Sequence, residues 1–230
     1  MASNLEILAY EDTPLGVLCL RRRELLARPG TVVTEVTLDH ELLMSSYNTA
    51  SERALARVAL EMRPGKGLNV LVGGLGLGYT AREALASDRV ASVEVVELLP
   101  QVLGWVERDL IPLARELRSD ARLKMVQGDV YRLLAAPPRH AYDLILIDVD
   151  HSPDDRLAGG DDAFYSLEGL RRAAGHLAPG GVLGVWSYAE SSPFADALRA
   201  AFREVRIEPV EFDNKLVDAV QTDWLFFARL

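Results

Sequence analysis

One acid stands where a long apolar run gives way to a polar loop. Leu144–Ile147 are all apolar, and charge appears next at Asp148. Asp150 and His151 follow at the start of the loop 149–162. Carboxylates beside an imidazole can hold a cationic amine and accept its proton. The sequence therefore predicts Asp148 as a proton acceptor, assisted by Asp150 and His151.

The same loop has two other interpretations. An acidic loop that is only solvated carries no chemistry. A metal ion bound by Asp148, Asp150 and His151 is the second, but side chains that are neighbours in a loop seldom all converge on one ion. We therefore expect no metal site here.

A glycine-rich stretch follows the apolar run Asn69–Val72. It contains Gly73, Gly74, Gly76 and Gly78. A turn without β-carbons lets a ligand approach the backbone, and a helix that begins near Thr80 points free N–H groups at that ligand. A glycine turn alone is a weak signal, because such turns also occur without any ligand.

Two more acids end later predicted strands. Glu97 follows Gly78 by 19 residues, the spacing at which a carboxylate can accept both hydroxyls of a ribose. Asp129, followed by Val130, can accept from an adenine amino group. The simpler interpretations are a surface acid for Glu97 and a helix cap for Asp129. With the glycines, these residues predict a nucleoside site at the carboxyl ends of parallel strands.

Alternating strands and helices between residues 46 and 230 would position these groups. The expected helices cover 51–60 (with Ser51 as N-cap), 80–86, 100–117, 130–135, 166–177 and 194–202, and the expected strands cover 69–72, 93–97, 123–126, 142–148, 182–187, 204–210 and 222–229. This alternation predicts a parallel sheet with helices on both faces. The last two strands have no helix between them and should pair antiparallel.

Residues 1–45 predict a separate β unit. Its expected strands are 5–10, 15–20 and 31–38, divided by turn residues. Such a unit is too small to bury a core alone, so it should pack on the domain formed by 46–230 or on a second subunit.

Composition limits the partners. The formal net charge of −9 argues against DNA or RNA, because a polyanion requires a basic face. No apolar run approaches the roughly 20 residues of a membrane span, and residues 1–6 do not resemble a signal peptide. Cys19 is the only cysteine, so no internal disulfide forms. We expect a cytoplasmic protein that acts on a small molecule.

The glycine turn, Glu97, Gly128–Asp129 and Asp148 together resemble the class I S-adenosylmethionine-dependent transferases, and more narrowly the spermidine synthase family. The resemblance implies a Rossmann-like, mostly parallel seven-stranded sheet with an antiparallel last strand, preceded by a small N-terminal β unit. It also implies a homodimer. The glycines would lie beside the methionine part of the cofactor, with Glu97 at the ribose, Asp129 at the adenine and Asp148 facing the nucleophile.

The chain departs from this family at three places. Spermidine synthases have Gly-Gly-Gly-Asp-Gly-Gly where this chain has Gly73–Gly78, so Gly76 replaces the aspartate. The Tyr-His/Gln-Glu motif keeps only Glu52, and the Asp-Ser-Ser-Asp-like loop appears as Asp148-Val149-Asp150-His151. In the family, that aspartate suits decarboxylated S-adenosylmethionine, and it would repel the carboxylate of the intact cofactor.

Its absence leads us to expect methyl transfer from S-adenosylmethionine to a small, amine-bearing acceptor. The catalytic candidates are Asp148, Asp150, His151 and Glu52. One alternative is aminopropyl transfer from decarboxylated S-adenosylmethionine, as in polyamine synthesis. The other is a nucleotide-binding module without catalysis.

Overall fold

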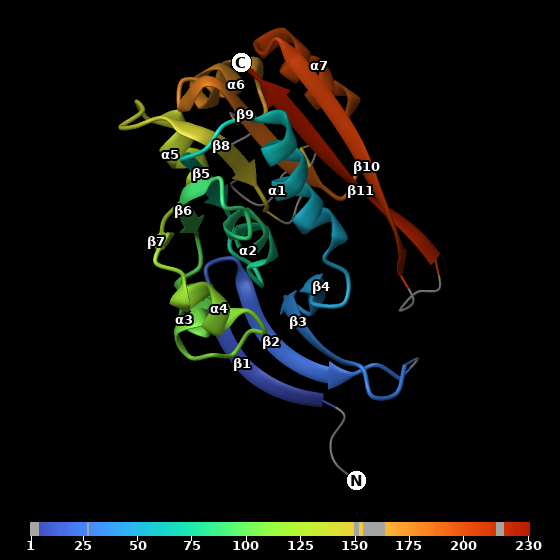
Figure 1. Cartoon of the computed structure of the whole chain (residues 1–230). Coiled ribbons are helices and arrows are strands. Elements are labelled where there is room, and N and C mark those ends of the chain that lie inside the picture. The colour runs from blue at the N-terminus through green and yellow to red at the C-terminus, as the bar shows by residue number, and fades with distance from the viewer. Residues whose placement is uncertain (1–4, 27, 150–151, 154–163, 215–218) are drawn as a thin grey trace.

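The computed structural model describes residues 5–26, 28–149, 152–153, 164–214 and 219–230. Two sheets form its framework, a four-stranded sheet in the order β1-β2-β3-β4 and a seven-stranded sheet in the order β10-β11-β9-β8-β5-β6-β7. Figure 1 shows the smaller sheet, in blue, below the α/β layers of the larger one.

The smaller sheet is antiparallel throughout. It consists of β1 (Leu5–Thr13), β2 (Gly16–Glu24), β3 (Val32–Leu38) and β4 (Glu41–Ser45). We did not expect β4. The tight β3–β4 turn holds Asp39 and His40 at φ 47° and 72°, a left-handed conformation for which glycine is the usual sequence signal. Leu18, Leu20 and Val36 share the core of the larger sheet, so the unit packs on the following chain. That 1–45 and 46–230 are separate domains stays a prediction.

The larger sheet confirms the expected fold. Its strands are β5 (Leu68–Gly73), β6 (Val90–Glu97), β7 (Leu123–Gln127), β8 (Tyr142–Ile147), β9 (Leu177–Ser187), β10 (Glu204–Asn214) and β11 (Ala219–Arg229). The strands β7-β6-β5-β8-β9 pair in parallel, whereas β11 runs antiparallel to both β9 and β10. The predicted antiparallel pairing of the last two strands is therefore correct.

Helices cover both faces of this sheet. They are α1 (Ala50–Met62), α2 (Tyr79–Leu85), α3 (Pro100–Glu107), α4 (Ala114–Ser119), α5 (Val130–Ala135), α6 (Leu167–Ala174) and α7 (Ser192–Ala201). Alternate residues of β8 enter two different cores: Leu144 and Leu146 pack with α1–α4, and Ile145 and Ile147 pack with α5–α7. Burial on both faces explains the continuous apolar run before Asp148. None of the described helices is long and apolar enough to cross a bilayer.

Two local predictions were wrong. The helix expected over 100–117 is divided into α3 and α4, because Asp109 takes a left-handed φ of 56° and Pro112 follows. Ser51 is not the N-cap of α1. Thr49 occupies that position without a side-chain hydrogen bond, and Ser51 instead contacts two carboxylates.

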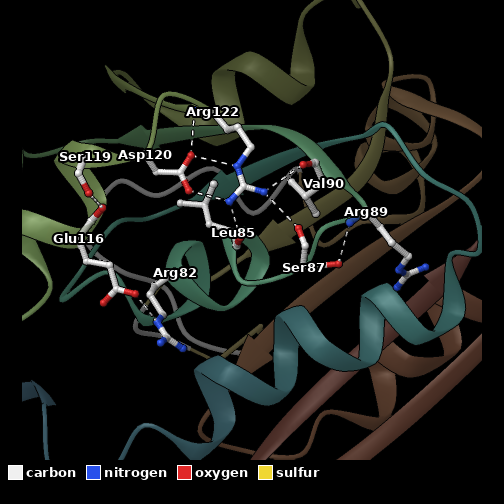
Figure 2. A network of polar contacts seen from close by, with 9 residues as sticks. All are labelled: Arg82, Leu85, Ser87, Arg89, Val90, Glu116, Ser119, Asp120 and Arg122. Atoms are coloured by element: carbon white, nitrogen blue, oxygen red, sulfur yellow. Dashed lines mark hydrogen bonds and ion pairs between the residues drawn. The ribbon is translucent and has the colours of Figure 1, made fainter.

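Arg122 joins the start of β7 to the chain between α2 and β6 (Figure 2). Its guanidinium donates to the carbonyl oxygens of Leu85, Ser87 and Val90 and to the Asp120 carboxylate, the last at 2.7 Å. Leu85 ends α2 and Ser87 follows it, where helical partners are missing, whereas Val90 begins β6. One side chain therefore satisfies several backbone acceptors at once.

Replacing Arg122 with alanine is expected to lower the free energy of unfolding by about 2 kcal/mol, because several charge-assisted hydrogen bonds to backbone carbonyls are lost together. Urea denaturation measures this change. Arg115→Ala is the matched control. Arg115 is 88% exposed with one ion pair to Asp109, so its removal should change stability little. Equal effects of the two substitutions would show that the Arg122 contacts contribute nothing specific.

Candidate active site

The glycine turn packs closely against the residue that follows β8 and against the first residue of α5. Gly74, Gly76 and Gly78 have φ values of 91°, 53° and 88°, which an L-residue adopts only with strain. A β-carbon on Gly74 would lie 2.2 Å from the carbonyl oxygen of Asp148, and one on Gly73 would lie 2.8 Å from the methyl carbons of Val130. The turn is thereby fixed between the end of β8 and the start of α5.

Gly76 faces the smaller sheet. A β-carbon at this position would lie 2.9 Å from Sδ of Met44, a residue of β4. An aspartate at position 76 would therefore point toward a thioether of the N-terminal unit. The space beside Gly76 is already filled by an apolar side chain.

Glu97 is a buried acid, not the surface acid of the simpler interpretation, with 7% of its surface exposed. Its carboxylate accepts hydrogen bonds from the Leu75 N–H and the Leu99 N–H, both at 2.8 Å. Burial raises the pKa of Glu97, and these backbone donors oppose the rise. The carboxylate holds the glycine turn in place. Hydrogen bonding of Glu97 to a ribose stays a prediction.

Asp129 is the N-cap of α5. Its Oδ1 accepts from the N–H groups of Tyr131 at 2.9 Å and Arg132 at 3.2 Å. Val130 is buried and packs against Gly73. The simpler interpretation of Asp129 as a helix cap is therefore correct. Contact of Asp129 and Val130 with an adenine stays a prediction.

Three half-buried carboxylates from distant parts of the chain meet beyond the strand ends. Glu52 lies at the start of α1, Asp148 directly after β8, and Asp223 in β11. The Ser51 hydroxyl links two of them, 3.1 Å from Oε2 of Glu52 and 2.6 Å from Oδ2 of Asp223. We call Glu52, Asp148 and Asp223 the acid cluster. The sequence indicated the first two and missed the third.

Thr80 connects Asp148 to the backbone of Glu52. Its hydroxyl donates to Oδ2 of Asp148 and lies 3.1 Å from the carbonyl oxygen of Glu52. Thr80 is buried at the start of α2, immediately after the glycine turn. The acid cluster therefore borders the turn. Thr80 carried a sequence signal only as the first residue of a helix.

The cluster has an excess of negative charge. Burial, and next the charge of Asp148, raise the pKa of Glu52 to about 8. Burial, and further the charge of Asp223, raise the pKa of Asp148 to about 6 against the Thr80 hydrogen bond. Within the described part of the chain, no Lys, Arg or His pairs with these carboxylates. Such a site favours a cationic ligand.

Asp150 and His151 lie outside the described residues, as does most of the loop 149–162. Their assistance to Asp148 stays a prediction. The same holds for the expectation that no metal binds there.

We compared the chain with protein-family models and with the sequences of known proteins. No family model matches the chain. Polyamine aminopropyltransferase 2 of Streptomyces coelicolor is 34% identical over 122 residues, 50% of this chain and 21% of that protein. The polyamine aminopropyltransferase of Prochlorococcus marinus is 31% identical over 141 residues, 61% of this chain and 44% of that protein. The chain thus spans less than half the length of these relatives.

Solved structures bear on the fold. The spermidine synthase of Thermotoga maritima matches with a TM-score of 0.73 at 18% identity, over 97% of this chain and 72% of that one. The chain has a spermidine synthase-like fold. A spermidine synthase in complex with the transition-state analogue AdoDATO gives the same values. The resemblance read from the glycine turn and the strand-end acids is confirmed, as is the Rossmann-like class I architecture.

These relatives contradict the expectation of methyl transfer. Both sequence relatives are named for aminopropyl transfer, so the chain is related to that group of transferases. The methyl-transfer prediction rested on Gly76, and the structure shows why that residue misled. Position 76 faces Met44, so the lack of an acid there does not make room for a cofactor carboxylate. The homodimer and the cytoplasmic location stay predictions.

Proposed function

We propose that this chain transfers an aminopropyl group from decarboxylated S-adenosylmethionine to a small amine. The acid cluster is the observation that carries the proposal. Three carboxylates without a basic partner among the described residues adjoin the glycine turn of a spermidine synthase-like fold. The names of the sequence relatives support the same reaction.

The residues present fit the nucleoside and the amine. The turn 73–78 has glycine at four positions, of which Gly74 and Gly76 are partly exposed, and the buried Glu97 carboxylate lies directly behind it. The acids attract an ammonium group and repel a carboxylate, which favours the decarboxylated form of the cofactor. When bound, its sulfonium activates the carbon that is attacked and makes the thioether a leaving group.

The chain's own residues then have two tasks. The acid cluster holds the acceptor so that its nitrogen faces the activated carbon, which removes most of the entropic cost of the encounter. Asp148 accepts a proton from the acceptor's ammonium, since only the free amine is nucleophilic. A nitrogen–carbon bond forms as the carbon–sulfur bond breaks, methylthioadenosine leaves, and the proton passes through Asp148 to solvent.

The experiment incubates the protein with decarboxylated S-adenosylmethionine and a series of amines, and follows methylthioadenosine by mass spectrometry. We expect amine-dependent release, together with binding of the decarboxylated cofactor at least roughly tenfold tighter than the intact one, because the cluster repels a carboxylate. Intact S-adenosylmethionine is the matched control. Tighter binding of the intact form would contradict the proposal, and binding without product from any amine would favour a non-catalytic module.

A further inference from the structure

Ser51 lies between two carboxyl groups with a single hydrogen to give. Its Oγ is 2.6 Å from Asp223 and 3.1 Å from Glu52, and the residue is buried, with 3% of its surface exposed. If the hydroxyl donates to Asp223, as the shorter distance indicates, its remaining capacity toward Glu52 is that of an acceptor. Two ionised carboxylates cannot both be satisfied by this hydroxyl. A proton on Glu52 would let this acid donate to the Ser51 oxygen and would remove one of two neighbouring negative charges.

Asp223 is positioned by the sheet. It pairs with Val210 of β10, but pairing between β11 and β9 begins one residue later, at Trp224 opposite Ser187. Asp223 therefore stands where β11 passes the end of β9 and meets the start of α1. This is the edge at which ligands bind in sheets of this kind.

The charged groups around the pair are few. Asp148, directly after β8, lies near Glu52, as does Tyr79 of α2. Arg53 of α1 lies 5.0 Å from the centre of the Tyr79 ring and pairs with Glu83. Arg53 is thus engaged elsewhere. In the described structure, the pair Glu52–Asp223 is left with anionic neighbours.

We propose that Asp223 is an acceptor-binding residue, and that Glu52 shares one proton with it through Ser51 until an ammonium group enters and that proton leaves to solvent. This inference rests on the proposed function, because it supposes an amine acceptor. It adds a residue, Asp223, and a proton balance to that function.

The electrostatics agree. The pKa of Glu52 is raised to about 8, so its carboxyl group is largely protonated at neutral pH, and burial also raises the pKa of Asp223. An incoming cation stabilises the ionised form of Glu52 and expels its proton. Binding that releases a proton is favoured as pH rises, so amine affinity should increase from pH 7 toward pH 8.

Calorimetry tests whether a proton is released when the amine binds. Protein saturated with methylthioadenosine is titrated with 1,4-diaminobutane at pH 7 in phosphate and in Tris, whose ionisation enthalpies differ. We expect about one proton released by the wild type and almost none by Glu52→Gln, which keeps a donor toward Ser51 but holds no exchangeable charge. Diamine binding without proton release by the wild type would overturn the inference.

Steady-state kinetics test whether Asp223 binds the acceptor. Asp223→Asn should raise the KM for the diamine roughly tenfold or more while kcat changes less than about threefold, because a binding contact and not the chemical step is removed. Glu211→Gln, an exposed acid on β10, removes the same charge and should change neither value. Unchanged methylthioadenosine affinity shows that Asp223→Asn is folded. Equal KM values in the two variants would overturn this inference while leaving aminopropyl transfer intact. Absence of transfer by the wild type to any amine would overturn both.

Discussion

Asp148→Asn is expected to lower turnover about 10³-fold, within the range for loss of a general base, while the affinity for methylthioadenosine changes less than about threefold. Asparagine keeps the size of the side chain and its acceptance of the Thr80 hydroxyl, but it cannot take the acceptor's proton. Rapid-quench measurement of methylthioadenosine formation, beside calorimetry with the same nucleoside, separates the two effects.

The pH profile provides a second test of the same residue. Because the pKa of Asp148 is raised to about 6, its carboxyl group is protonated below that pH and cannot accept a proton. Wild-type kcat/KM should therefore fall as pH drops below 6, and Asp148→Asn should lose this limb. Asp196→Asn, an exposed site on α7, makes the same chemical change as a control and should keep wild-type values. Turnover of Asp148→Asn equal to that control would exclude Asp148 as the base.

Gly74→Ala is expected to lower the free energy of unfolding by about 3 kcal/mol or more and to abolish measurable nucleoside binding. The added methyl group would overlap the carbonyl oxygen of Asp148, a backbone atom that cannot move without displacing the end of β8. The affected hydrogen bond, from the Asp148 N–H to the Gly73 carbonyl at 2.8 Å, joins the turn to β8. Thermal denaturation and methylthioadenosine calorimetry measure both effects.

Gly30→Ala separates backbone strain from overlap. Gly30 has a φ of 85°, close to the 91° of Gly74, yet no described atom lies within 4 Å of the position that an added β-carbon would take. Its substitution should cost only about 1 kcal/mol, the usual penalty for a left-handed alanine, and should leave nucleoside binding unchanged. If Gly74→Ala were no worse than Gly30→Ala, the close contact with Asp148 would not constrain the turn.

The fold could be predicted from the sequence because the central strands are nearly continuous apolar runs. Such runs are expected where both faces of a sheet are buried. Leu144–Ile147 divide between two cores, and a strand of a sheet covered on both faces buries all four. The strand β4 escaped prediction because Asp39 and His40 form its turn without glycine. The break between α3 and α4 depends on a left-handed Asp109, which helical periodicity does not reveal.

The site was partly predictable for a different reason. Glu97 and Asp148 end strands whose carboxyl termini share one edge, so order along the chain is enough to bring them together. Asp223 could not be placed, because the sequence does not show that β11 lies between β9 and β10. The signal available was an acid directly before the apolar run Trp224–Ala228. Gly76 misled because its neighbour, Met44, belongs to another sheet.

The position of β11 also links this site to folding. Ser51 and Asp223 are 172 residues apart in the chain, and their contact requires β11 to have entered the sheet between β9 and β10. A partly folded chain with an open sheet therefore lacks the complete acid cluster. Contacts of such long range form late and at a high entropic cost. A ligand that needs the complete cluster would bind the closed sheet and not the open one, and would thereby raise the free energy of unfolding.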